Sequence, residues 1–84
     1  MGYKYHSFNL NSGNTIQVNL KQNGDVLVMD NMNLRYFSSG NNYNYLGGGF
    51  TSGIVNIKVP NSGTWNLVVL PHGNGVVNYE YGIV

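Results

Sequence analysis

Few side chains in this sequence are able to do chemistry. The carboxylates are Asp25, Asp30 and Glu80, and the imidazoles are His6 and His72. Catalysis needs groups that exchange protons, attack a substrate or hold a metal ion. The two histidines have no short metal-ligand spacing to each other or to a carboxylate, and no nucleophile motif occurs. We therefore predict a protein that is not an enzyme, with no catalytic residue, no metal and no cofactor.

The best candidate binding residues lie in the middle of the chain. Tyrosine offers a flat apolar face with a polar tip, which suits glycans, nucleotides and protein partners. Arg35 could grip a phosphate or carboxylate through its forked donors, and Asp30 could accept a hydrogen bond from a sugar hydroxyl. The predicted ligand-binding residues are Asp30, Arg35, Tyr36, Tyr43, Tyr45, Gly47 and Gly48.

Each of these residues also has a structural alternative. Asp30 could cap the turn that follows it, and Tyr43 and Tyr45 could pair across strands. The backbone amides of the glycine run 47–49 could cradle a phosphate, but the run lacks the lysine and helix of a P-loop. A bulge or tight corner is the alternative for these glycines. Trp65 could stack on a sugar or base, yet its phase with the next aliphatic residues favours a place in the core.

The composition favours strands joined by tight turns. The 84 residues suit one domain, 1–84, and include no alanine, fifteen asparagines and twelve glycines. No cysteine is present, so no disulfide supports so small a core, and oligomerisation is an alternative means of support.

Apolar residues alternate with polar ones in short runs, as in strands. Ile16, Val18 and Leu20 are expected on one buried face, and the turn Asn23-Gly24 is a strong hairpin signal. Residues 31–40 are expected to form a long loop or a single helical turn, and Asn42–Leu46 a strand. The predicted strands lie in residues 3–10, 15–20, 25–30, 42–46, 54–59, 65–69 and 77–81. The predicted fold is all-β: a single compact antiparallel β-sandwich, jelly-roll-like, of about seven short strands.

The charge excludes two classes of partner. A net charge of +1 is too weak for an electrostatic footprint on a nucleic acid polymer or an acidic membrane. The amino-terminal residues lack the apolar run of a signal peptide, and no stretch approaches a membrane span. We expect a cytoplasmic protein whose partner is a small polar ligand or another protein.

Several short motifs resemble a bacterial domain-of-unknown-function family, number 1883. They are Val28-Met29-Asp30, Asn33, Tyr36, Gly40, Tyr43-x-Tyr45-x-Gly47-Gly48 and Val59-Pro60-x-Ser62-Gly63-x-Trp65. The resemblance covers nearly the whole chain, and its last motif is the most specific. It implies a small β-sandwich, in some members fused to TIR domains of bacterial immune signalling. The chain departs from the family at Leu70-Pro71-His72, where an acidic residue is expected.

Two functions from different classes follow as hypotheses. In the first, the domain binds a small polar, nucleotide-derived ligand in TIR-linked defence signalling, or a phage-borne copy acts as a sink for such a signal. In the second, it is an assembly or adaptor module that forms homo-oligomers through its strand edges. Tyr3, Tyr5, Tyr79 and Tyr81 are either an outward aromatic interface for that purpose or ordinary strand residues. Glycan binding is a third option.

Overall fold

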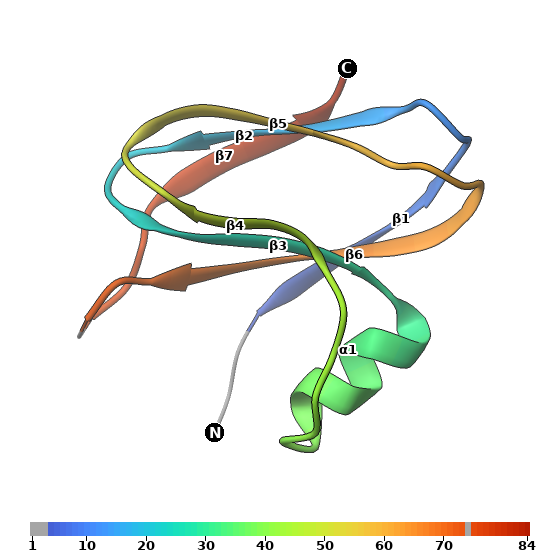
Figure 1. Cartoon of the computed structure of the whole chain (residues 1–84). Coiled ribbons are helices and arrows are strands. Elements are labelled where there is room, and N and C mark those ends of the chain that lie inside the picture. Colours follow the sequence, from blue (N-terminus) through green and yellow to red (C-terminus); the bar gives the residue numbers. More distant parts are fainter. Residues whose placement is uncertain (1–3, 74) are drawn as a thin grey trace.

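Seven strands and one helix follow one another in the computed structural model, which describes residues 4–73 and 75–84 (Figure 1). Met1 to Tyr3, and with them the prediction made for Tyr3, lie outside the described residues. The elements are β1 (Tyr5–Leu10), β2 (Thr15–Leu20), β3 (Gly24–Asp30), α1 (Asn31–Ser38), β4 (Leu46–Phe50), β5 (Gly53–Lys58), β6 (Gly63–Pro71) and β7 (Tyr79–Ile83).

The strands form two antiparallel sheets packed face to face, which confirms the predicted sandwich. One sheet has the order β1-β6-β3-β4 and the other has the order β5-β2-β7. The chain changes sheet at most of its connections, and only β3 and β4 are successive strands of one sheet. Figure 1 shows the sheets as two layers, with α1 below the four-stranded sheet on its outer side. Strands β1, β4, β5 and β7 are therefore the four sheet edges.

The main core lies between the two sheets and follows the predicted alternation. Ile16, Val18 and Leu20 of β2 are at most 2% exposed, and the polar residues between them face outward. Val55, Ile57 and Val59 are also buried as predicted. Each of these side chains contributes about 1.5–3 kcal/mol of hydrophobic stabilisation on burial.

The two central strands of the larger sheet are buried on both faces. Val26 and Val28 point into the main core, whereas Leu27 and Met29 form a second cluster on the outer side with Val68. Leu34 and Phe37 of α1 and Tyr43 of the segment that follows it cover this second cluster, and Leu70 of β6 packs against it from within the sheet. The helix therefore covers a sheet face that would otherwise be an exposed apolar patch.

The predicted hairpin at Asn23-Gly24 is wrong. These residues connect β2 in one sheet to β3 in the other, and the two strands do not pair. The tight turn exists, but β3 pairs with β4 and β6 because its two apolar faces need the centre of a covered sheet. Gly24 is required there, since a Cβ atom would lie 2.7 Å from the carbonyl oxygen of Leu70.

The segment between β3 and β4 also differs from prediction. Residues 31–38 form an eight-residue helix rather than a long loop or a single helical turn. The predicted strand Asn42–Leu46 is wrong, because β4 begins at Leu46 and runs through the glycines. Tyr43 is instead held by its packing against the outer cluster, which removes it from any strand pairing.

Candidate functional site

A small groove lies where β3 ends and α1 begins, and we call it the Asp30 groove. It has a volume of about 160 Å³. Its walls come from four parts of the chain: the end of β3, the first turn of α1, the segment that precedes β4, and strand β6. The residues that line it are Val28, Met29, Asp30, Asn33, Asn44, Tyr45, Leu46 and Trp65.

Hydrogen bonds order the polar side of the Asp30 groove. Asp30 is the N-cap of α1, and its Oδ1 accepts from the backbone N–H of Asn33 at 2.9 Å and from Asn33 Nδ2 at 2.8 Å. Asn33 Oδ1 in turn accepts from the backbone N–H of Asn44 at 2.8 Å. The capping alternative for Asp30 is therefore realised, and both of these bonds use one oxygen of the carboxylate.

Two aromatic side chains form the other side of the groove. Tyr45 is 49% exposed, and its ring lies 5.5 Å from that of Tyr43. Trp65 is partly buried against the main core, as predicted, and its Nε1 donates to the carbonyl of Asn61 at 2.9 Å. Trp65 thus packs in the core and also presents part of its ring to the groove.

The structure brings only some of the predicted residues together. Asp30 and Tyr45 share the groove, with Tyr43 beside Tyr45. Arg35 and Tyr36 lie on the exposed side of α1 and are not among the residues that line it.

The glycine run has a role that the sequence did not reveal. Gly47 pairs with Leu27 and Gly48 with Val26, so both glycines belong to the β3–β4 ladder. A Cβ atom on Gly47 would collide with the carbonyl oxygen of Val26. Gly47 therefore serves the close approach of β4 to β3, whereas a Cβ atom on Gly48 would meet no atom within 4 Å.

A histidine–carboxylate pair lies at the opposite end of β3, and sequence reasoning missed it. His72 Nε2 lies 2.8 Å from Asp25 Oδ1, although 47 positions separate the two residues. Their side chains are 46% and 39% exposed, so the pair is screened by solvent and adds at most about 1 kcal/mol. A Cβ atom on Gly49 would lie 3.2 Å from that Asp25 oxygen, so the glycine leaves room for the pair.

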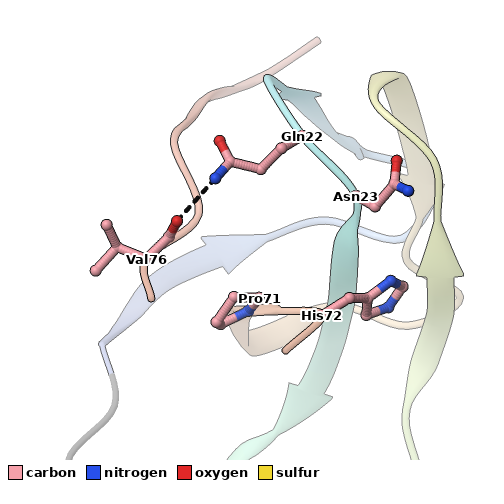
Figure 2. A pocket seen from close by; sticks show the side chains of 5 residues that line it. All are labelled: Gln22, Asn23, Pro71, His72 and Val76. Carbon is pink, nitrogen blue, oxygen red and sulfur yellow. Dashed lines mark hydrogen bonds between the residues drawn. The ribbon is translucent and has the colours of Figure 1, made fainter. Parts of the chain in front are cut away.

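His72 also borders a second open groove. Figure 2 shows His72 and Pro71 at its floor and Gln22 reaching across to Val76, with a hydrogen bond of 2.8 Å from Gln22 Nε2 to the Val76 carbonyl. The groove has a volume of about 390 Å³, and Asn23 completes its lining. No short-range motif marks the His72–Asp25 pair, because the antiparallel register of β3 and β6 creates it.

A third groove lies along the facing edges of the two sheets, and we call it the β1–β7 groove. It is the largest of the three, with a volume of about 640 Å³. His6 of β1 stands between two tyrosines of β7: its Nε2 lies 2.8 Å from the Tyr79 hydroxyl and its Nδ1 3.0 Å from the Tyr81 hydroxyl. Burial raises the pKa of Tyr79 above 10.0, and the neighbouring Tyr81 adds to the shift.

Of the β7 tyrosines considered for an outward interface, Tyr79 is partly buried, whereas Tyr81 is 44% exposed. In β7, Tyr79 and Tyr81 have the phase of the residues that face the other sheet, opposite Leu20 and Val18 of β2. The imidazole of His6 stacks on Tyr81 with ring centroids 4.2 Å apart. Tyr5 is 50% exposed on β1.

Two kinds of feature are absent from residues 4–73 and 75–84. Within them, no three histidine, cysteine, aspartate or glutamate side chains gather as metal ligands. Within the same residues, no helix has the length and apolar character to cross a membrane.

Comparison with known proteins gives one result. Neither the curated proteins nor the solved structures compared with the chain contain a match. The family described as Domain of unknown function (DUF1883) matches residues 1–82. This match covers six strands entirely, β7 up to its last residue but one, and the residues of all three grooves, and the chain is therefore a member of the DUF1883 family.

Proposed function

We propose that this protein is a non-enzymatic binding module for a small ligand that carries a hydroxylated ring, and that the ring occupies the Asp30 groove. The ring is either the ribose of a nucleotide-derived compound or the sugar of a glycan. A nucleotide-derived ligand would suit a cytoplasmic role in TIR-linked bacterial defence signalling, or a role as a phage-borne sink for such a signal.

The pairing of a carboxylate with aromatic faces in one groove carries this proposal. Asp30 uses Oδ1 for the helix cap, and its Oδ2 is the acceptor we assign to a ring hydroxyl. Tyr45 and Trp65 provide apolar faces for the C–H side of the same ring. A groove of about 160 Å³ is smaller than pockets that enclose drug-sized ligands, which suits one sugar ring rather than a whole nucleotide.

The remainder of a larger ligand would lie outside the groove. Arg35 and Tyr36 are exposed on the same helix that Asp30 caps. The forked donors of Arg35 suit a phosphate, and Tyr36 and Tyr43 offer further aromatic surface. In this arrangement Asp30 binds a hydroxyl of the ring and Arg35 binds the phosphate.

Isothermal titration calorimetry against ADP-ribose, cyclic nucleotides, free ribose and simple glycans tests the proposal. Asp30→Asn keeps a capping side chain but removes the charged acceptor, so we expect about a tenfold loss of affinity for every ligand that binds. Arg35→Met should weaken only the phosphorylated ligands by a similar factor. This difference separates a nucleotide-derived ligand from a glycan.

The matched control is Glu80→Gln, which removes an exposed carboxylate from β7, far from α1 in the fold. It should leave every affinity unchanged. The proposal is wrong if no member of the panel binds, or if Asp30→Asn and Glu80→Gln have the same effect.

A second candidate function is self-assembly through the edge of β5. This strand pairs with β2 over six residues in regular register, and its other edge is open. From Gly53 to Ile57 it carries no charge, and charge is one of the usual protections of an open edge. Ile54 is also 58% exposed there. Two copies joined at β5 would form a continuous six-stranded sheet.

A further inference from the structure

The β1–β7 groove has the size and lining of a small-molecule site. Its volume of about 640 Å³ falls within the range of ligand pockets. Apolar walls come from the end of β6 and from the segment before β7: Val69, Leu70, Pro71, Val76 and Val77. The polar groups are Lys4, His6, Asn78 and the two tyrosines, and the described lining includes no carboxylate.

The electrostatic character of this lining favours an anion. Lys4 contributes a full positive charge at the rim. Glu80 lies on the opposite face of β7, since it pairs with Asn19 of the outward polar row, and it is 3.6 Å from Lys21. A negatively charged group entering the groove therefore meets one cation and no competing carboxylate among the lining residues.

The hydrogen bonds around His6 make the number of free tyrosine hydrogens in this groove depend on whether the imidazole is protonated. A neutral imidazole has one N–H donor and one acceptor nitrogen. In that state one tyrosine hydroxyl accepts from His6 and the other must donate its hydrogen to the ring. An imidazolium donates from both nitrogens, so both tyrosines accept and both hydroxyl hydrogens become free to point at a ligand.

We propose that the β1–β7 groove binds a small planar aromatic anion, and that binding is accompanied by uptake of one proton at His6. The aromatic ring lies against the apolar wall of the groove and the rings of Tyr79 and Tyr81. The anionic group lies between Lys4 and the two tyrosine hydroxyls, which His6 in its charged form leaves free to donate.

The groups that face His6 support this assignment of the proton. From β7 they are the two tyrosine hydroxyls. Lys4, ahead of β1, lines the same groove, and its positive charge opposes a second cation at His6 until an anion is bound. From β6, Leu67 and Val69 are apolar. No carboxylate among the described residues touches the imidazole, so the ligand itself supplies the negative charge that stabilises the imidazolium.

Nuclear magnetic resonance titration with 2-naphthalenesulfonate tests the proposal, because the sulfonate stays ionised at all pH values used. We expect shifts confined to Lys4 and β1, the end of β6, residues 75–78 and β7. We also expect affinity that falls as the pH rises, by up to about tenfold per unit. The neutral analogue 2-naphthalenesulfonamide should bind at least about tenfold more weakly at the lower pH.

Three variants assign the effect to residues. Lys4→Met should weaken binding of the sulfonate by about tenfold, whereas Lys58→Met, which removes an exposed lysine from β5, should not. His6→Gln should abolish the pH dependence of binding. Tyr81→Phe keeps the ring but removes one hydroxyl, and it should weaken the sulfonate more than the sulfonamide.

Several results would overturn the proposal. These are equal affinity for the sulfonate and the sulfonamide, equal loss in the two lysine variants, or unchanged pH dependence in His6→Gln when its amide spectrum shows a folded protein. Absence of binding by the wild-type protein at millimolar ligand has the same consequence. None of them affects the Asp30 groove, which lies at the junction of β3 and α1 and is tested with other variants.

Discussion

At the scale of single residues, position 47 of β4 accepts only glycine, for two reasons. Its φ of 104° lies in the region that residues with a side chain rarely adopt. In addition, the carbonyl oxygen of Val26 occupies the space that a Cβ atom would need. The glycine therefore serves the pairing of two strands, and a ligand is not required to explain it.

Gly47→Ala should lower the free energy of unfolding by at least about 2 kcal/mol, from backbone strain and the collision together. Chemical denaturation measures this. Gly82→Ala is the matched control, because Gly82 has no positive φ and a Cβ atom added there would meet no atom within 4 Å. Similar midpoints for the two variants would contradict the explanation.

Tyr79 is a second single residue with an effect on the whole fold, because its raised pKa makes stability depend on pH. Burial favours the neutral phenol, so the folded state retains the proton after the unfolded chain has lost it. Stability is then fully present below pH 10 and falls as the pH rises through the raised pKa. Denaturation between about pH 9 and pH 12 should show this fall, and Tyr79→Phe should reduce it.

At the scale of elements, a structural role of α1 and its proposed ligand role meet at its N-cap residue. The helix covers the outer apolar cluster with Leu34 and Phe37. Its N-cap, Asp30, lines the proposed ligand groove. In the proposed function, helix formation and ligand binding would therefore be coupled through one carboxylate, and variants of Asp30 must separate the two effects.

Asp30→Ala should destabilise the protein by about 1 kcal/mol and increase amide exchange in residues 31–38, because the cap is lost. Asp30→Asn should preserve exchange protection, since asparagine caps helices as well as aspartate does. If both variants weaken the ligand while only Asp30→Ala frays the helix, the charge of Asp30 acts in binding independently of the cap.

At the scale of the whole molecule, the open sheet edges are the surfaces on which the proposed self-assembly depends. A sandwich of two open sheets leaves four edges, and an 84-residue chain has a narrow margin of stability. At β4 the positive φ angles of Gly47 and Gly48 make the backbone irregular, which hinders pairing with another chain. In β5 only the first residue, Gly53, has a positive φ, so the edge lacks this protection from Ile54 onward.

If β5 joins two copies, light scattering at high protein concentration should show a dimer, and Ile54→Lys should convert it to a monomer. The physical reason is that a lysine on an edge strand opposes pairing with a second edge. Val76→Lys is the control, because Val76 is 78% exposed and lies outside the strands. A monomeric wild-type protein would remove self-assembly as a function.

The residues of the three grooves differ in how far the sequence could predict that they lie together. Asp30 and Tyr45 were predictable because a carboxylate followed by tyrosines is visible in a short segment. His6 with Tyr79, and Asp25 with His72, were not predictable, since 73 and 47 positions separate them. Only the strand order brings these pairs together, and no pattern in a single sequence encodes it.

Periodicity alone determined that this chain buries Ile16, Val18 and Leu20 between two sheets, because side chains alternate across a strand whatever its neighbours are. Tertiary structure decided what local signals could not: the crossing at Asn23-Gly24, the helix that covers Leu27 and Met29, and the meeting of β1 with β7. The physical reason is that burial selects strand partners over long distances, whereas turn and helix preferences act over only a few residues.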